Sequence, residues 1–377
     1  MELDFPIEEY EDRVRRVQEK LRDRALDALI VQTPEIVHYL CGYDAAWLVS
    51  LAEFSGLIVF ASVEPVLVTR TLESKAVKKQ VARVRLFSEL EGPWRLLTEI
   101  MTEAGVAEGV IGIEEGTVTV RKLNRLKEIL PRARVVNAEG LVEALMAAPS
   151  KREVELVKRA GLITRAGFRR AVETIREGVP LYEVMNRATE AMYEAGMTEQ
   201  RLSGTYTMSL AWAGPDGGAM HESDVTRKVK YGDLVNAEIW GTYKHYTAAS
   251  QGTVYVGQDP APEIVNAYNV LAQMYLSMRD VTRPGVPVSE VWAAGNSVYR
   301  AAYGVDYYRT LGPQQGSAAL LGRIGPNVGD CLKAGSAYFL QPLVNDPLFA
   351  SVAATVLVTE NGCVEITEPL LSLVTVR

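Results

Sequence analysis

The sequence predicts two domains: an α/β domain over residues 1–148, then an α+β domain over residues 149–377 that contains an internal duplication. Three observations support this prediction. The chain has 377 residues, which is too long for one ordinary core. Strand-like and helix-like segments alternate through its first part, and a short motif occurs twice in its second part.

The first domain begins with an amphipathic helix and continues with apolar runs of strand length. Tyr10, Val14, Val17 and Leu21 have helical spacing, which predicts a helix over residues 8–24. Four segments then predict buried strands: ALDALIVQT, FSGLIVFA, EPVLVTR and VIGIEEG. A helix is expected over residues 91–104. The alternation is typical of an α/β domain.

The domain boundary is expected at the segment AAPSKREVELVKRAG. Pro149 ends the preceding helix, because proline cannot continue it. Ser150 is a good N-cap for the next helix, and Glu153 stands three residues later. This spacing predicts a capping box at the start of the second domain.

The second domain contains the motif G-V-P-x-x-E-V twice. GVPLYEV (178–184) and GVPVSEV (285–291) each follow a predicted helix and open another. Strand-like segments follow each copy, at 203–210 and 232–257 after the first and at 336–344 and 351–359 after the second. The repetition predicts a pseudo-twofold α+β domain with a pocket where its halves meet.

Composition excludes several classes of protein. The chain has 40 basic and 47 acidic residues, a net charge of −7, which argues against a nucleic acid partner. Its three cysteines are widely spaced, which favours a cytoplasmic location and gives no zinc motif. The first twenty residues lack the apolar core of a signal peptide, and no apolar run could span a membrane.

His221, separated by ten residues from Gly232-Asp233, leads into the paired strands that end in TVYVG. Together with ATVLVTENG (354–362), YRTLGPQQG (308–316) and LKAGSAYFLQPLV (332–344), this arrangement resembles the creatinase/aminopeptidase P family. The resemblance implies a pita-bread fold for the second domain. It also implies a homodimer, in which a loop of the partner's N-terminal domain closes the site.

The metallopeptidases of that family bind two divalent metal ions through two aspartates, a histidine and two glutamates. By resemblance, these five positions fall on Glu238, Ala249, Pro313, Gln341 and Ala353. A dinuclear site needs several anionic oxygen ligands, and only Glu238 could supply one. We therefore expect no metal and no other cofactor.

Creatinase and similar enzymes of the family work without metal, using a histidine and two glutamates. The histidine corresponds to His221, and the glutamates correspond to Gln251 and Gln341. Glutamine can orient a substrate but cannot transfer a proton. His221 and Glu238 are therefore the predicted catalytic pair, since a buried Glu beside an imidazole is a workable acid–base pair. Alternatively, Glu238 could have no catalytic role and simply be held in place by hydrogen bonds.

The resemblance suggests three further substrate-binding residues. Glu53 falls where creatinase-like dimers carry an arginine that binds a carboxylate, and an acid there would favour a cation. Trp47 on the same loop could pack its ring against a ring or a cation of the substrate, although most such aromatics are core residues. Arg323 could be an anion clamp, or simply a surface arginine.

The sequence thus predicts a metal-independent enzyme that cleaves a C–N bond of a small nitrogenous substrate. Two alternatives stay open. The chain could be a catalytically dead peptidase fold that binds a peptide or small ligand. It could also be a metal-dependent Xaa-Pro peptidase whose ligands lie at other positions.

Overall fold

The computed structural model describes residues 3–43, 54–77, 82–198, 208–220, 224–316, 322–345 and 347–377. The chain divides into two compact units, Met1–Met146 and Ala147–Arg377. The division falls two residues before the expected end of the first domain at 148. Among the described residues, no helix has the length and hydropathy needed to cross a bilayer.

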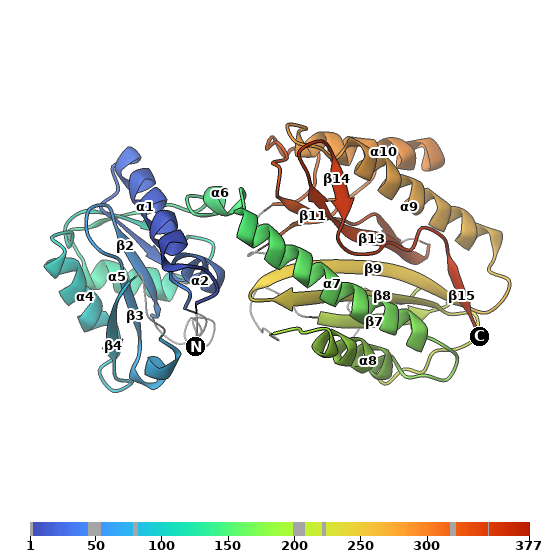
Figure 1. Cartoon of the computed structure of the whole chain (residues 1–377), viewed down its shortest axis with the longest axis horizontal. Coiled ribbons are helices and arrows are strands. Elements are labelled where there is room, and N and C mark those ends of the chain that lie inside the picture. Colours follow the sequence, from blue (N-terminus) through green and yellow to red (C-terminus); the bar gives the residue numbers. More distant parts are fainter. Residues whose placement is uncertain are drawn as a thin grey trace. The chain divides into compact units, whose positions relative to one another are not determined.

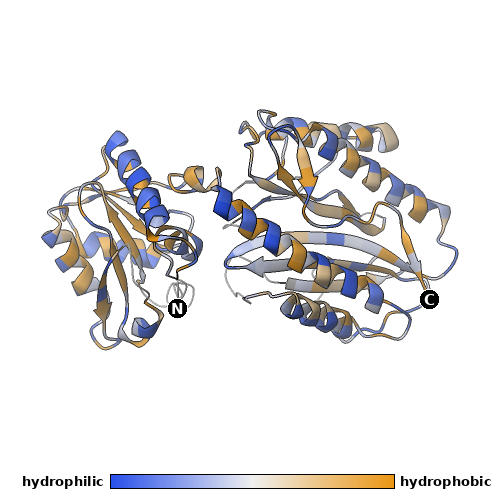
Figure 2. Cartoon of the chain, in the orientation of Figure 1, coloured by the Kyte–Doolittle hydropathy of each residue, from blue (hydrophilic) through white to orange (hydrophobic). Residues whose placement is uncertain are grey.

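The N-terminal unit is a mixed sheet with helices, as predicted. Its strand order is β4-β3-β2-β1-β5-β6, in which β1 pairs antiparallel with β2 and parallel with β5. The strands are β1 (Ala28–Val31), β2 (Gly56–Phe60), β3 (Val66–Arg70), β4 (Arg83–Phe87), β5 (Val110–Ile113) and β6 (Arg134–Asn137). The helices are α1 (Ile7–Asp23), α2 (Pro34–Cys41), the 3-10 helix η1 (Thr71–Ala76), α4 (Trp94–Glu103), α5 (Val120–Ile129) and α6 (Glu143–Met146). The apolar stripe of α1 is buried, and its two-sided character is visible in Figure 2.

A capping box starts the second unit. The Ser150 hydroxyl accepts a hydrogen bond from the Glu153 backbone N–H at 3.2 Å, and the Ser150 N–H donates to the Glu153 carboxylate at 2.8 Å. Helix α7 (Lys151–Thr174) follows directly. The prediction from Ser150 and Glu153 is confirmed.

The second unit consists of two similar successions of elements. The first is α7, α8 (Leu181–Glu194), β7 (Met208–Gly214), β8 (Leu234–Tyr243) and β9 (Tyr246–Val256). The second is α9 (Pro262–Val281), α10 (Val288–Tyr303), β10 (Gln314–Gln315), β11 (Ala337–Leu340), β12 (Leu343–Asn345) and β13 (Phe349–Val358), followed by β14 (Cys363–Glu365) and β15 (Val374–Val376). The strand expected over 203–210 lies partly outside the described residues, and β7 continues to Gly214. The main sheet has the order β10-β11-β13-β9-β8-β7, so the halves join where β9 pairs with β13.

The repeated motif has the same conformation in both halves, which confirms the predicted duplication. Gly178 and Gly285 have φ angles of 85° and 82°, a region that favours glycine. Pro180 and Pro287 are the N-cap residues of α8 and α10, and each forms an isolated bridge to a later segment. The residues that the two copies of the motif share therefore form the same turn in each half of the unit.

The sheet of the second unit presents its two faces differently. Figure 1 shows α7 and α8 beside β7, β8 and β9, and α9 beside β13, in agreement with their contacts. Val235, Ala237 and Ile239 of β8 face the α7–α8 core. Side chains alternate along a strand, so the residues between these three point to the opposite face. That face is buried yet carries polar groups, and β8 and β9 are correspondingly paler in Figure 2 than the N-terminal strands.

Candidate functional site

A row of polar side chains crosses the face of the sheet that points away from the helices. Glu238 on β8 stands directly opposite Gln251 on β9, and Gln251 stands opposite Ala353 on β13. Gln341 follows the last residue of β11, which pairs with the residue next to Ala353. The register thus brings residues from both halves of the duplicated unit together.

Hydrogen bonds join three of these side chains, which we call the Glu–Gln cluster: Glu238, Gln251 and Gln341. The Gln341 Nε2 group donates to Gln251 Oε1 at 2.8 Å and lies 3.4 Å from Glu238 Oε1. The Trp240 indole N–H also donates to Glu238 Oε1, at 2.9 Å. One carboxylate oxygen therefore receives both donors.

Two polar atoms of the cluster have no hydrogen-bond partner among the described residues: Glu238 Oε2 and Gln251 Nε2. The side chains are buried, since Glu238 is 3 % exposed and Gln251 0 %. Leaving a buried donor or acceptor unmet costs about 1–3 kcal/mol. Native proteins rarely accept that cost without a reason such as a bound molecule or a catalytic role.

Glu238 is suited to proton transfer near neutral pH. Burial raises the pKa of Glu238 from its ordinary value of 4.5 to about 7, against the opposing effects of the Trp240 hydrogen bond and of Arg309. Since Glu238 Oε1 already accepts from Trp240, the acidic proton belongs on Oε2. The free oxygen is therefore the one that gains and loses the proton.

Arg309 is a charged neighbour that the sequence did not reveal. Its cation lies close enough to lower the pKa of Glu238. The segment is held against the cluster because the backbone N–H of Gln341 donates to Leu311 O at 3.1 Å. The Arg309 carbonyl also accepts from the Trp292 indole at 2.9 Å. Arg309 lies within YRTLGPQQG, but no family position pointed to it.

The ligand positions implied by the resemblance do not fit a dinuclear metal site. Ala249 and Ala353 form a small apolar cluster with Trp240 and Phe339. The two aromatic rings of this cluster meet edge to face, with centroids 5.5 Å apart. Among the residues the structure describes, no group of three acidic, histidine or cysteine side chains gathers around Glu238. Methyl groups and one amide cannot replace the anionic oxygens that a pair of divalent metal ions needs.

The structure brings three of the predicted site residues together and leaves the others apart or outside its description. Arg323 has an exposed side chain, and its backbone forms an isolated bridge with Pro313. This exposure agrees with a surface arginine, and the assignment of Arg323 as an anion clamp stays a prediction. His221, Trp47 and Glu53 lie outside the described residues, so their assignments stay predictions.

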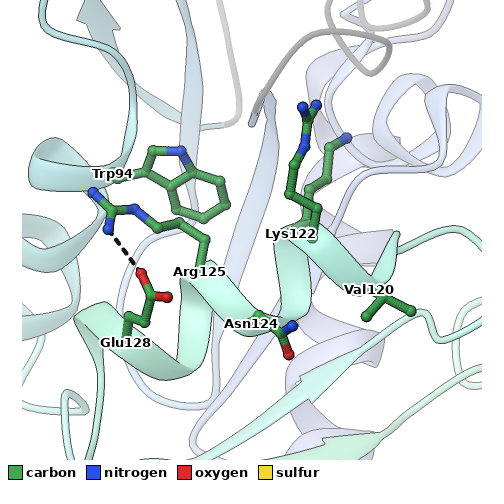
Figure 3. Close-up of a pocket in the computed structure, with 7 residues that line it drawn as sticks. Trp94, Val120, Lys122, Asn124, Arg125 and Glu128 are labelled. Atoms are coloured by element: carbon green, nitrogen blue, oxygen red, sulfur yellow. Dashed lines mark hydrogen bonds and ion pairs between the residues drawn. The ribbon is translucent and has the colours of Figure 1, made fainter.

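A separate pocket of about 610 Å³ belongs to the N-terminal unit (Figure 3). It is lined by Trp94, Val120, Arg121, Lys122, Asn124, Arg125 and Glu128. Arg125 donates to Glu128 at 2.8 Å, and Arg121 and Lys122 have interactions of their own. None of these described side chains carries a buried polar atom without a partner, in contrast to the Glu–Gln cluster.

Comparisons with known proteins identify both units. Residues 13–145 match the creatinase/prolidase N-terminal domain, and residues 155–366 match metallopeptidase family M24. The chain is 28% identical to the uncharacterized hydrolase/peptidase y4tM of Sinorhizobium fredii, over 84% of this chain and 82% of that protein. It is 24% identical to the ectoine hydrolase of Halomonas elongata, over 96% of each protein.

A solved structure shows the same fold across the whole chain. The dipeptidase PepE from Mycobacterium ulcerans superposes with a TM-score of 0.83 at 24% identity, covering 99% of each chain. The likeness confirms the predicted combination of an α/β domain and a pita-bread domain. The chain belongs to metallopeptidase family M24, a family of hydrolases that act on C–N bonds, and carries a creatinase/prolidase N-terminal domain before the M24 domain.

Proposed function

We propose that this chain is a hydrolase that cleaves a C–N bond of a small nitrogenous compound without a bound metal ion. The observation that carries the proposal is the buried Glu238 carboxyl, whose pKa of about 7 and unpartnered Oε2 suit it to proton transfer. The donor set supports the metal-independent form of the reaction, because four of the five family ligand positions cannot supply an anion.

The proposed chemistry needs only water and the side chains of the cluster. Glu238 Oε2 takes a proton from a water molecule as its oxygen bonds to the electrophilic carbon. The Gln251 Nε2 group donates to the atom on which negative charge develops. The C–N bond then breaks, and the proton held on Glu238 passes to the departing nitrogen. The Gln341 amide fixes the relative positions of the Glu238 carboxylate and the Gln251 amide through its contacts with both.

The proposed site has two further parts. His221 is the second proton-transfer group, on the strength of its spacing to Gly232 and of the suitability of imidazole near neutral pH. A homodimer completes the site, with Glu53 and Trp47 of the N-terminal loop contributed across the interface. The likeness to an ectoine hydrolase over nearly the full chain supports a small substrate rather than a long peptide.

A binding protein without catalysis is the second candidate. The observation that favours it is the pair of amides, Gln251 and Gln341, at positions where the resemblance implies glutamates. Amides can hold a ligand by donating and accepting hydrogen bonds, while they transfer no protons. A molecule that binds the cluster and is recovered intact would favour this candidate.

Chelator-treated protein, freed of chelator by dialysis, provides the test. We expect it to hydrolyse small amides or ureides in a substrate panel. Glu238→Gln and His221→Ala are both expected to abolish that activity. A matched control is Glu360→Gln, an exposed acid whose loss should leave turnover unchanged. Survival of activity in both the Glu238→Gln and the His221→Ala variants would contradict the assigned chemistry.

Metal analysis tests the other part of the proposal. Protein purified without chelator is expected to contain no stoichiometric manganese, cobalt or zinc. Two equivalents of such an ion, together with activity that chelation removes and the ion restores, would instead establish a metal-dependent peptidase with other ligands.

A further inference from the structure

We infer that the Glu–Gln cluster binds an uncharged amide-type group, in which an N–H stands next to a C=O, and discriminates against guanidinium and amidinium cations. Lactams, cyclic ureas and ureides belong to this class. The inference deepens the proposed function and rests on the same site, although it concerns binding and can be tested without turnover.

The orientation of the amides follows from the carboxylate. Glu238 Oε1 and Gln251 Oε1 both face Gln341 Nε2. Turning the Gln251 amide would place its NH₂ against the NH₂ of Gln341. Turning both amides would place the Gln341 oxygen against Glu238 Oε1. Only the observed arrangement matches donors with acceptors, so Nε2 is the atom that Gln251 leaves free.

The free Gln251 Nε2 group can be satisfied only by an acceptor. Guanidinium and amidinium groups carry N–H donors and no acceptor, so they would leave this buried donor unmet. One unmet buried donor lowers affinity by about tenfold. A carbonyl oxygen meets the requirement.

Glu238 Oε2 supplies the complementary half of the recognition. When ionised it accepts a hydrogen bond from an N–H, and when protonated it donates one to an acceptor. Glu238 and Gln251 stand directly opposite each other on neighbouring strands. One planar group with an N–H and a C=O on adjacent atoms can therefore donate to Glu238 Oε2 and accept from Gln251 Nε2. A lactam or cyclic urea presents this pair in its fixed cis arrangement.

The electrostatics of the cluster also disfavours a cationic ligand. The cluster contains a single ionisable side chain, whereas the resemblance implies two glutamates, at positions 251 and 341, in the metal-free enzymes that bind a cationic substrate. The nearby Arg309 adds a positive field, which disfavours a second cation at the same place. The site therefore lacks the excess negative charge that would hold a guanidinium.

Two probes of the same shape test the inference: imidazolidin-2-one, a cyclic urea, and 2-iminoimidazolidine, its cyclic guanidinium counterpart. Binding to the metal-free, full-length protein is measured by ligand-observed NMR at pH 7. We expect the cyclic urea to bind about tenfold more tightly than the guanidinium. Gln251→Met should remove about that factor for the urea and change guanidinium binding little. Gln251→Glu should reverse the preference.

Gln315 gives a matched control, because it is also a buried glutamine with an unpartnered Nε2 but lies outside the cluster. Gln315→Met should leave the preference intact. Equal or tighter binding of the guanidinium to the wild-type protein overturns the inference, and so does failure of the cyclic urea to bind at its solubility limit. Urea preference without hydrolysis of any amide would retain the inference and remove the enzyme proposal. Hydrolysis with a guanidinium preference would do the reverse.

Discussion

Replacing Glu238 with Gln removes the ionisable group of the cluster and keeps its shape. Burial raises the pKa of Glu238 from 4.5 to about 7, so the folded protein holds this proton more tightly than the unfolded chain does. The resulting stabilisation is complete below pH about 4.5 and is lost as the pH rises through about 7. The full effect corresponds to about 3 kcal/mol of unfolding free energy.

Between pH 5 and pH 8 the wild-type protein should lose about 2–3 kcal/mol of unfolding free energy through this group, and Glu238→Gln should not lose it. A glutamine at this position can still accept the Trp240 hydrogen bond through its oxygen. Urea unfolding of both proteins at the two pH values gives the comparison. Burial raises the pKa of Glu114 to about 7 as well, but its contribution is common to both proteins and cancels.

The exposed Glu360 serves as the control, because a solvated carboxylate changes its surroundings little on unfolding. Glu360→Gln should lose the same free energy as the wild-type protein between the two pH values. If Glu238→Gln also behaves like the wild-type protein, the carboxyl is not desolvated in the folded state. The assignment of Glu238 as the acid–base group would then lose its physical basis.

Three further changes have defined outcomes. Arg309→Gln removes the cation that lowers the pKa of Glu238, so the pH dependence of turnover set by that group should move to higher pH, measured as a pH–rate profile. Ser150→Ala should lower the unfolding free energy by about 1 kcal/mol in urea titration through loss of the cap, and an unchanged midpoint would contradict this. Gly312→Ala places a Cβ 1.8 Å from a carbonyl oxygen at φ 108°, whereas Gly304→Ala at φ 75° meets nothing within 4 Å. The first should therefore be at least about 2 kcal/mol more destabilising than the second by thermal unfolding.

Local patterns in the sequence were sufficient for most of the fold. The four apolar runs in the first domain are strands because they are buried on both faces, and the repeated motif marks the turns before α8 and α10. The strands β4 and β6 were missed. Their sequences, RVRLF and RVVN, carry charged or polar residues and are largely exposed or half-buried, so they give no apolar signal.

The candidate site was predictable only where one strand register determines it. Glu238 and Gln251 belong to adjoining strands joined by a tight turn, so their alignment follows from the sequence of the hairpin. Arg309 reaches the cluster through a loop that hydrogen-bonds to the residue after β11, a contact between segments with no shared periodicity.

The packing of Trp240 and Phe339 around Ala249 and Ala353 limits the substitutions that this part of the sheet can accept. An Ala249→Asp substitution would bury a second negative charge beside an indole and a phenyl ring. Such a protein would be destabilised, because an unpaired buried charge is among the most damaging substitutions. The aromatic rings would have to shrink first, so a single substitution cannot easily introduce an acidic ligand at this position.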